Sequence, residues 1–581
     1  MSIQSSHNVA QILFDQASRP DLRDQPRFMV PVGERFAPVT WGQFATRIER
    51  VASFLMERGI DRDSKVAVLS ETRLEWGIAG LAVGAARGVL VPVYPTLVGE
   101  PLAHILAHSD ARLLFVENAE QLARVLSVWD RLGIETLITF EQLDLKGLAR
   151  DAGLDPDPIV ACAVSLAQAE QIGEQALARH PEHVRERLSQ ITLDDVASLI
   201  YTSGTTGLPK GVLLSHRNVA VNGADWVALN GPMLRQGDVD VLWLPMSHIF
   251  GWGQFSLGNQ LGFVTYFSSP TQALQHLADL SPHLFMSVPL YWEKLARMAQ
   301  AVSPDEAQQQ AELRRLTGGR LRFCLSGGAG LEREVKEFFK ATGIMIIEGY
   351  GLTECSPTLT MNRIDDYDFS SVGKPYPSVR LKLAADGEIL TKGENVFLGY
   401  HKDPEATRGM FDQGGWLKTG DLGRFNEGGY LQIIGRKKEI LVTAGGKNIP
   451  PENIERHFRD DPLIARLVVC GDGKKYLTAL VDIDDQVARA RLMEAGSVEA
   501  GLSDIAQMSA MALRRHPKLH QWIDDRIKAV NRSLAPYETI KAFCVADEPL
   551  TVEAGMLTPS LKVKRNPVYE RYRQALEALY E

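Results

Sequence analysis

The chain has 581 residues, more than one ordinary hydrophobic core accommodates, so two or more domains are expected. With 45% hydrophobic and 23% charged residues, the composition is typical of a globular protein. The 63 basic and 72 acidic residues give a formal net charge of -9, which argues against a general binder of nucleic acid or of anionic membranes.

The cysteines and the apolar segments indicate the compartment. The five cysteines are scattered and form no CxxC pair, so neither a disulfide framework nor a zinc site is expected and a reducing, cytoplasmic location fits best. The first residues lack the basic and apolar regions of a signal peptide. The most apolar stretch, residues 76–95, contains Arg87 and two prolines, which predicts a buried helix and strand rather than a transmembrane segment. Peripheral membrane contact stays open, and no oligomeric state is indicated.

Helices and strands alternate through the first two thirds of the chain. Apolar residues at helical spacing predict an amphipathic helix from Thr40 that ends at Gly59. Short β-rich runs predict buried strands within residues 65–70, 88–95, 111–116, 284–289, 321–328 and 344–351. Residues 141–190 are helix-like and poor in motifs. This order predicts parallel sheets covered by helices.

The pattern changes from about Asp386. Glycine-rich short strands follow, which favour an antiparallel lobe, and then "GRKKE" stands between two apolar runs. We interpret this motif as a domain border, with one domain over residues 1–435 and a smaller α+β domain over residues 436–581.

A loop rich in hydroxyls and glycine lies within "LIYTSGTTGLPKGVLLSH", residues 199–216. Its glycines, among them Gly211, permit close approach of a ligand, its consecutive N–H groups can form an anion-binding nest, and Lys210 adds a cation. An ordinary P-loop is excluded, because Gly207 is followed by Leu-Pro-Lys rather than by Lys and then Ser or Thr. The alternative is a surface loop of turn residues.

Several blocks in fixed order resemble the adenylate-forming superfamily, which includes acyl-CoA synthetases. They are "YTSGTTGLPKG", "LPMSHIFG", "SGGA", "EGYGLTE", "KTGD", "GRKKEILVTAGGKNIPPENIE" and "LTPSLKVKR". The resemblance spans about residues 10–570. It implies a mixed α/β fold, in which a large N-terminal domain of two packed α/β subdomains plus a β-rich lobe is followed by a small mobile α+β domain.

The resemblance also implies a two-step reaction. A carboxylate attacks the α-phosphate of ATP and gives acyl-AMP and pyrophosphate, and the thiol of CoA then displaces AMP. Catalysis of the first step is mainly positioning and charge stabilisation. The partners implied are a fatty acid, ATP and CoA, with Mg²⁺ as the cofactor.

Family positions imply the residues that bind ATP. The polyphosphate is expected at Thr202, Ser203, Gly204, Thr205, Thr206, Gly207 and Lys210. The adenine is expected beside Gly327, Gly328, Ala329, Glu348, Gly349, Tyr350 and Gly351, with stacking on Tyr350. Asp421 would accept the ribose hydroxyls beside Arg436, Thr353 would donate to a phosphate, and Glu354 would bind Mg²⁺. A core tyrosine and a helix N-terminal acid are the alternatives for Tyr350 and Glu354.

The C-terminal blocks imply the moving parts. Lys562 would bridge the carboxylate and the α-phosphate, and it is preferred over its neighbour Lys564. Lys438 resembles the hinge about which the small domain swings between the two steps. Gly445 and Gly446 would line the tunnel for CoA, although a simple turn is the alternative.

The acyl pocket is expected around "LPMSHIFGW". His248 resembles the residue beside the acyl carboxylate, and Trp252 is either a gate of a fatty-acid tunnel or plain core. Together with "LTPSLKVKR", this favours a medium- to long-chain fatty acid. The alternatives are an aromatic acid, an acyl-AMP ligase that delivers to a carrier protein, and an inactive ATP-binding scaffold.

Overall fold

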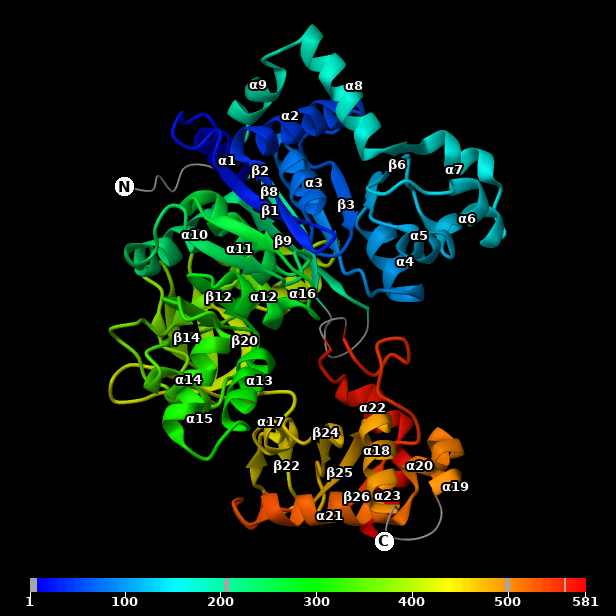
Figure 1. Cartoon of the computed structure of the whole chain (residues 1–581), viewed down its shortest axis with the longest axis vertical. Helices are drawn as coiled ribbons and strands as arrows, with labels where there is room; N and C mark the ends of the chain where they lie inside the picture. The colour runs from blue at the N-terminus through cyan, green and yellow to red at the C-terminus, as the bar shows by residue number, and fades with distance from the viewer. Residues whose placement is uncertain (1–7, 203–207, 497–501, 559–560) are drawn as a thin grey trace.

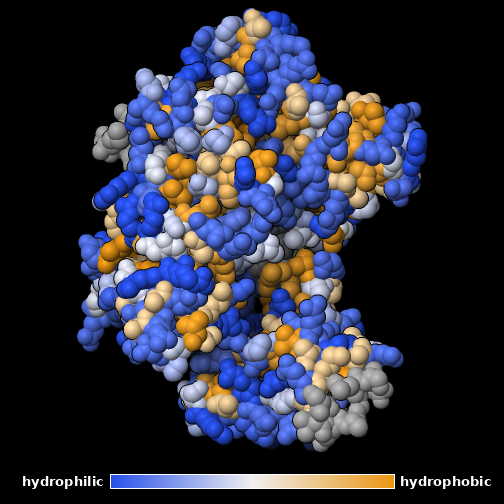
Figure 2. Space-filling view, viewed as in Figure 1, coloured by the Kyte–Doolittle hydropathy of each residue, from blue (hydrophilic) through white to orange (hydrophobic). Residues whose placement is uncertain are grey.

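The computed structural model describes residues 8–202, 208–496, 502–558 and 561–581. Figure 1 shows a large body that contains about the N-terminal three quarters of the chain and a smaller C-terminal part below it. Figure 2 shows a mainly hydrophilic face with a hollow where the two parts meet. In the part of the chain that the structure describes, no helix is both long and apolar enough to cross a membrane.

An eight-stranded sheet forms one half of the large domain, in the order β19-β9-β8-β4-β3-β5-β6-β7. Neighbours from β8 to β7 are parallel, whereas β9 is antiparallel to both β8 and β19. The strands are β3 (Lys65–Leu69), β4 (Val89–Val93), β5 (Leu113–Val116), β6 (Thr136–Thr139), β7 (Ala163–Ser165), β8 (Val196–Thr202), β9 (Lys210–Ser215) and β19 (Gly399–Tyr400).

A nine-stranded sheet forms the other half, in the order β16-β15-β14-β13-β12-β10-β11-β1-β2. Its centre, from β14 to β1, is parallel, and both edges are antiparallel. The strands are β1 (Pro26–Val32), β2 (Arg35–Thr40), β10 (Val239–Leu242), β11 (Val264–Phe267), β12 (Leu284–Ser287), β13 (Phe323–Ser326), β14 (Ile346–Gly351), β15 (Thr358–Met361) and β16 (Lys374–Pro375).

The remaining sheets are smaller. An antiparallel lobe has the order β17-β18-β20-β21, with β17 (Arg380–Leu383), β18 (Glu388–Lys392), β20 (Leu417–Phe425) and β21 (Leu431–Arg436). The C-terminal part has a hairpin of β22 (Leu441–Val442) and β23 (Asn448–Ile449) and a three-stranded sheet of β24 (Ile464–Cys470), β25 (Leu477–Ile483) and β26 (Ile540–Val545).

Helices cover the sheets. The N-terminal ones are α1 (Val9–Ala17), α2 (Trp41–Glu57), α3 (Leu74–Ala85), α4 (Gly99–His108), α5 (Ala119–Leu126), α6 (Leu145–Asp151), α7 (Pro156–Cys162), α8 (Leu166–Arg179) and α9 (His183–Ser189). The middle ones are α10 (His216–Asn230), α11 (Ile249–Leu261), α12 (Ala273–Leu280), α13 (Pro289–Gln300), α14 (Glu306–Leu316), α15 (Arg333–Ala341) and α16 (Pro404–Gly409). The C-terminal ones are α17 (Pro451–Glu455), α18 (Asp485–Gly496), α19 (Leu502–Gln507), α20 (Ala510–Arg514), α21 (Pro517–Asn531), α22 (Arg565–Arg571) and α23 (Arg573–Glu577). Short 3-10 turns are η1 (Trp129–Arg131), η2 (Gly231–Met233), η3 (Thr353–Cys355), η4 (Arg456–Phe458) and η5 (Ala578–Tyr580).

Two close approaches show why glycine occurs in these helices. A Cβ on Gly173 of α8 would lie 1.7 Å from the Arg50 carbonyl oxygen of α2, so the two helices touch through backbone. A Cβ on Gly77 of α3 would lie 2.6 Å from the Phe255 ring of α11, which joins the two halves of the large domain. In both places a larger residue would force the elements apart.

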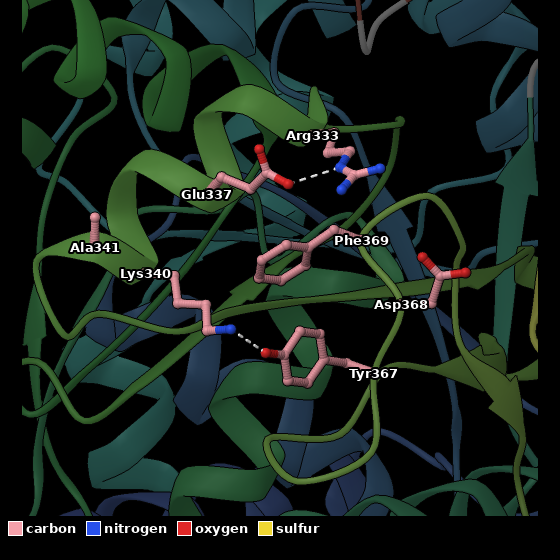
Figure 3. Close-up of a pocket in the computed structure, with 7 residues that line it drawn as sticks. All are labelled: Arg333, Glu337, Lys340, Ala341, Tyr367, Asp368 and Phe369. Atoms are coloured by element: carbon pink, nitrogen blue, oxygen red, sulfur yellow. Dashed lines mark hydrogen bonds and ion pairs between the residues drawn. The ribbon is translucent and has the colours of Figure 1, made fainter.

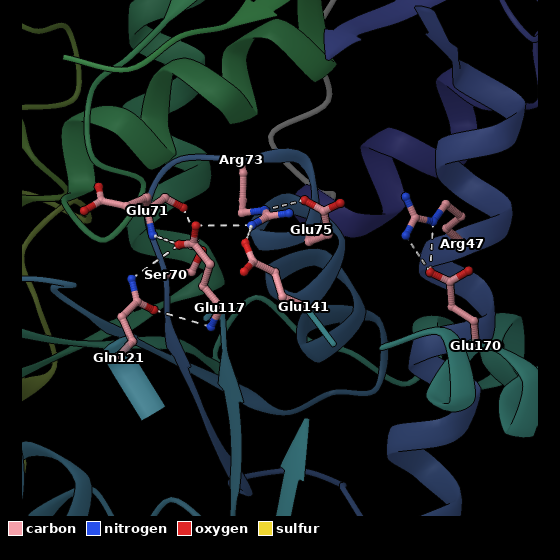
Figure 4. A network of polar contacts seen from close by, with 9 residues as sticks. All are labelled: Arg47, Ser70, Glu71, Arg73, Glu75, Glu117, Gln121, Glu141 and Glu170. Carbon is pink, nitrogen blue, oxygen red and sulfur yellow. Dashed lines mark hydrogen bonds and ion pairs between the residues drawn. The ribbon is translucent and has the colours of Figure 1, made fainter. Parts of the chain in front are cut away.

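A polar network closes the end of the eight-stranded sheet (Figure 4). Arg73, which precedes α3, pairs with Glu75 at 2.7 Å, with Glu117 at 3.2 Å and with Glu141 at 3.1 Å. Glu117 follows β5 and also accepts hydrogen bonds from the Ser70 hydroxyl and the backbone N–H of residue 71, directly after β3. The guanidinium therefore neutralises carboxylates that the parallel strands bring together.

The large body and the C-terminal part of the chain meet through ion pairs. Arg297 of α13 lies 3.3 Å from Asp460, and Arg456 lies 3.4 Å from Glu332, which precedes α15. Glu293, one turn before Arg297, is only 5% exposed. Burial and then the Asp460 charge raise its pKa to about 7.

The mixed α/β fold class is confirmed, and so is the order of the elements. The predicted helix from residue 40 is α2, capped at Thr40 by a capping box with Gln43. All six predicted buried runs contain a strand, and the antiparallel lobe is present, although it begins at β17, before Asp386. The boundary at residues 435 and 436 falls at the end of β21, and the division into these two domains stays a prediction.

Candidate active site

The glycine-rich loop joins two antiparallel strands. Thr202 ends β8 and faces Lys210, the first residue of β9. Gly211 packs closely, because a Cβ there would lie 2.7 Å from the end of the Leu199 side chain. The predicted loop residues Ser203, Gly204, Thr205, Thr206 and Gly207 lie outside the described residues.

Lys210 and Glu354 meet at Tyr400. The Lys210 ammonium lies 5.1 Å from the centre of the Tyr400 ring and 3.5 Å from Asp403. The Tyr400 hydroxyl donates a 2.8 Å hydrogen bond to Glu354. Tyr400 belongs to the eight-stranded sheet, whereas Glu354 lies in η3, just after β14 of the nine-stranded sheet. The candidate polyphosphate site therefore spans the junction of the two sheets.

The donor set at Glu354 is suited to magnesium. Mg²⁺ is usually held by one or two carboxylates together with substrate phosphates and water. Glu354 offers one carboxylate beside the cationic Lys210, and Thr353 adds a hydroxyl in the same turn. Among the described residues, no cluster of three or more His, Cys, Asp or Glu side chains could hold a metal by itself. A cation at Glu354 would thus depend on ligands from the nucleotide.

Tyr350, Asp421 and Arg436 form a linked group. Asp421 of β20 faces Arg436 of β21 in register, and their side chains form an ion pair of 3.0 Å. The Tyr350 hydroxyl donates to the other Asp421 oxygen at 2.6 Å. Burial raises the pKa of Asp421, and the Arg436 charge opposes that shift. The carboxylate is 5% exposed, so it is positioned before any ligand binds.

The buried side chain of Glu348 has a structural role. Its carboxylate forms a 2.6 Å ion pair with Lys336 of α15, with both side chains at most 4% exposed. It also accepts a hydrogen bond from the backbone N–H of Leu331. This contact fixes the segment after Gly327, Gly328 and Ala329. The side chain therefore supports the predicted adenine site without facing it. Only the backbone of Glu348 is left to contact a nucleotide, and that contact stays a prediction.

The other small residues leave room around Tyr350. Gly328 has a φ of +85°, where a side chain would be strained, and a Cβ on Gly327 would lie 3.2 Å from the Phe250 ring. A Cβ on Gly351 would lie 1.9 Å from the Pro357 carbonyl, and one on Gly349 3.2 Å from a methionine side chain. These glycines permit β14 and its following turn to close around the tyrosine.

Lys562 enters this group from the C-terminal domain. Its ammonium donates a 3.1 Å hydrogen bond to the Gly328 carbonyl. A tight turn presents it, in which Thr558 N–H donates to the Lys562 carbonyl and the Thr558 hydroxyl accepts from Lys562 N–H. Burial and then the Arg436 charge lower the pKa of Lys562. Of the two lysines considered, Lys562 is the one that donates a hydrogen bond to the large domain, whereas Lys564 stands at the N-cap position of α22 without a side-chain capping bond.

The segment around Lys438 joins the domains. On one side, Lys437 pairs with Asp386 and Glu388 of the β-rich lobe. On the other side, Glu439 pairs with Arg565 of the C-terminal domain at 3.3 Å. Lys438 lies between these anchors, in a turn, and its role as a hinge stays a prediction.

The CoA-tunnel prediction has no support in this arrangement. Gly445 and Gly446 lie in the turn between β22 and β23, and Gly446 needs glycine because its φ is +73°. A Cβ on Gly446 would meet nothing within 4 Å. The turn interpretation explains both residues here, and a role in binding CoA stays a prediction.

His248 and Trp252 lie at the start of α11. The His248 Nδ1 accepts a hydrogen bond from Phe250 N–H and caps the helix. Burial, and next the Lys562 charge, lower its pKa to about 4, so the ring is neutral near pH 7. Trp252 stacks on Phe255 with ring centres 5.2 Å apart and packs beside Gly80. This packing favours a core role for Trp252, and its role as a gate of an acyl tunnel stays a prediction.

Sequence reasoning missed several residues that support the site. Tyr400, Asp403, Lys336 and Arg565 lie outside the positions quoted for the family resemblance or were not singled out within them. Tyr400 and Asp403 belong to "GYHKD", which follows the lobe's first strands and gives no chemical signal by itself. Only the fold places them beside Lys210.

A separate surface cavity of about 560 Å³ lies on the outer side of α15 (Figure 3). Arg333 and Lys340 of α15 line it together with Tyr367 and Phe369, which lie between β15 and β16. Its cations are already paired, Arg333 with Glu337 and Lys340 with the Tyr367 hydroxyl. It contains none of the predicted site residues, so we do not assign the reaction to it.

Comparison with known proteins gives the family. The model described as "AMP-binding enzyme" matches residues 19–401, and "AMP-binding enzyme C-terminal domain" matches residues 438–581. The chain is 31% identical to long-chain-fatty-acid–CoA ligase FadD15 of Mycobacterium bovis, over 99% of this chain and 97% of that protein. It is 29% identical to peroxisomal long chain acyl-CoA synthetase 6 of Arabidopsis thaliana, over 94% of this chain and 81% of that protein.

Solved structures show the same fold. The adenylation domain of carboxylic acid reductase from Segniliparus rugosus, in complex with AMP and a carboxylic acid, matches with a TM-score of 0.78 at 20% identity, over 100% of this chain and 95% of that one. Anthranilate CoA ligase AuaEII matches with a TM-score of 0.73 at 21% identity, over 99% of both chains. Together with the family models, which cover most of both domains, these matches lead to one conclusion: the chain belongs to the AMP-binding enzyme family.

Proposed function

We propose that this protein is an AMP-forming fatty acid–CoA ligase that acts in the cytoplasm. A fatty carboxylate attacks the α-phosphate of ATP, which gives acyl-AMP and releases pyrophosphate. The CoA thiol then attacks the acyl carbonyl, which gives acyl-CoA and AMP. The names of the relatives support this reaction and favour long-chain acids. The observation that carries the proposal is the contact of Lys562 with Gly328, beside the Tyr350–Asp421–Arg436 group.

The described residues suit the first step. Tyr350 offers an aromatic face for adenine, and Asp421 offers a buried carboxylate that can accept hydrogen bonds from ribose hydroxyls. Lys210 and the Thr353 hydroxyl are suited to phosphate oxygens. Mg²⁺, held by Glu354, would neutralise polyphosphate charge. Lys562 would attract both the carboxylate and the α-phosphate and so reduce their mutual repulsion.

The neutral His248 suits an acyl site. A cationic ring there would repel the ammonium of Lys562. With a neutral ring, Lys562 is the cation that attracts the carboxylate of the fatty acid. The adjoining Trp252, Phe255 and Trp76 form an apolar aromatic cluster, which can border an alkyl chain.

The second step requires Lys562 to leave, because the thiol must reach the same carbonyl. Rotation about Lys438 would remove it, since the neighbours of Lys438 are anchored to different domains. Gly445 and Gly446 would approach the site only after such a rotation.

The test measures the two steps separately. Fatty-acid-dependent exchange of pyrophosphate into ATP reports adenylation, and conversion of supplied acyl-AMP with CoA reports thioester formation. We expect exchange across a panel of medium- and long-chain acids. Lys562→Ala should lose exchange while it still converts acyl-AMP, and Lys564→Ala serves as the matched control. Absence of exchange with every acid would refute the proposal, and exchange without acyl-CoA would indicate a carrier protein as acceptor.

A further inference from the structure

Arg565 lies where the C-terminal domain, the hinge segment and the Lys562 turn come together. It is the first residue of α22, and its side chain is 11% exposed. The guanidinium forms two parallel hydrogen bonds with Glu455 at the end of α17, of 2.7 and 2.6 Å. Its Nε forms a third contact, of 3.3 Å, with Glu439. A bidentate pair of this kind fixes orientation as well as distance.

On the C-terminal side, the contacts of Arg565 are linked to the turn that carries Lys562. Lys562 is three residues before Arg565, and the chain between them is rigidly bonded. Leu557 and Val563 form a β-bridge, and Lys564 N–H donates to the Met556 carbonyl at 2.8 Å. The position of Arg565 is therefore transmitted to Lys562 through backbone.

Through Glu439, the contacts of Arg565 are also linked to the hinge segment. Glu439 directly follows Lys438, and its N–H donates to the Arg436 carbonyl at 3.0 Å. Arg436 in turn pairs with Asp421. Glu455 is also anchored within the C-terminal domain, because it accepts a 2.7 Å hydrogen bond from Val469 N–H of β24. Arg565 thus connects the hinge, the body of the small domain and the lysine turn.

We propose that Arg565 is a positioning residue that locks the Lys562 turn to the hinge segment, so that the turn and the hinge move together. This inference rests on the proposed function. Arg565 touches neither ATP nor the acid in this role. It sets where Lys562 lies when the small domain is in the adenylation arrangement.

The energetic reason is the burial of the partners. Glu455 is 15% exposed and Glu439 is 26% exposed, so a neutral residue at position 565 leaves a largely buried carboxylate without its cation. The Lys562 turn would then lose its fixed orientation. A displacement of about 1 Å at a reacting group can reduce a rate by roughly 100-fold.

The experiment compares the two half-reactions in Arg565→Gln, Arg565→Lys, Glu439→Gln and, as control, Arg571→Gln. Arg571 lies at the other end of α22, is 48% exposed and pairs with Glu548 on the surface. For Arg565→Gln we expect pyrophosphate exchange to fall about 100-fold while acyl-AMP conversion stays within about threefold of the unsubstituted chain. Arg565→Lys should recover part of the exchange, and Arg571→Gln should change neither reaction.

Glu439→Gln keeps the Arg565–Glu455 pair and removes only the charge of the link to the hinge, so it tests the inference if Arg565→Gln does not fold. It should lower exchange by about tenfold, which corresponds to one hydrogen bond to a charged group, and spare acyl-AMP conversion. Unchanged exchange, or equal loss in both half-reactions, would overturn the inference. Absence of exchange in the unsubstituted chain would instead refute the proposed function, so the two failures are distinguishable.

Discussion

Replacement of Glu293 by glutamine will change how stability depends on pH. This side chain lies in α13 at the domain interface, 5% exposed, and burial raises its pKa from 4.5 to about 7. The folded state therefore binds the proton more tightly than the unfolded state. Below about pH 4.5 the group is protonated in both states, and as the pH rises through about 7 the folded protein must accept a buried negative charge.

The magnitude follows from the shift. A rise from 4.5 to about 7 corresponds to about 3 kcal/mol at 1.36 kcal/mol per pKa unit. The unsubstituted chain should lose about this much free energy of unfolding between pH 4.5 and pH 8, and most of the loss falls above pH 5. Glu293→Gln carries no such charge, so its stability advantage over the unsubstituted chain should be about 2–3 kcal/mol larger at pH 8 than at pH 5.

Urea unfolding at the two pH values provides the assay. Eight of the nine tryptophans precede residue 436, so tryptophan fluorescence reports mainly on the large domain. Glu427→Gln, at an exposed carboxylate in the turn between β20 and β21, is the matched control and should show no comparable difference. If Glu293→Gln differs from the unsubstituted chain by the same amount at both pH values, burial does not hold the proton on Glu293 and the reasoning is wrong.

Three further predictions concern packing and the site. Gly173→Ala places a methyl group against the backbone carbonyl of α2 and should lower the urea midpoint, with a cost of about 1–3 kcal/mol in the free energy of unfolding. Lys336→Met leaves Glu348 buried without its cation, which should cost about 3–5 kcal/mol by the same assay, whereas the double change with Glu348→Gln should cost less than Lys336→Met alone. Tyr400→Phe removes the hydrogen bond to Glu354 and should lower kcat/KM for ATP by about tenfold or more in exchange assays, and an unchanged value would contradict the role of this contact.

Much of the fold could be predicted from the sequence because its elements carry local signals. The run "KVAVL" is short, apolar and rich in valine, which predicts a buried strand, and it forms β3. The apolar residues at helical spacing after Thr40 form α2, and the structure adds a capping box of Thr40 and Gln43 at its start. The start of the β-rich lobe was placed too late, because β17 alternates partly exposed residues and offers no strong apolar run.

The candidate site was predictable only in part. The resemblance identified Tyr350, Asp421 and Arg436, and the structure brings these three into direct contact. It could not show that the Glu348 side chain is used by Lys336, because the partner lies 12 residues away with no motif of its own. The role of Tyr400 likewise could not be predicted, because it depends on the pairing of β19 with β9 and on a hydrogen bond from Tyr400 to Glu354 near the other sheet.

Tyr400 links the two sheets of the large domain, which matters for any attempt to engineer that domain. Its backbone belongs to one sheet and its hydroxyl is bonded to a residue of the other, so the spacing between Lys210 and Glu354 depends on how the two halves fit together. Substitutions at the distant contact of Gly77 with Phe255, which sets that fit, should alter nucleotide affinity without touching the nucleotide. The packing between the two halves would in this way contribute to ATP use as well as to stability.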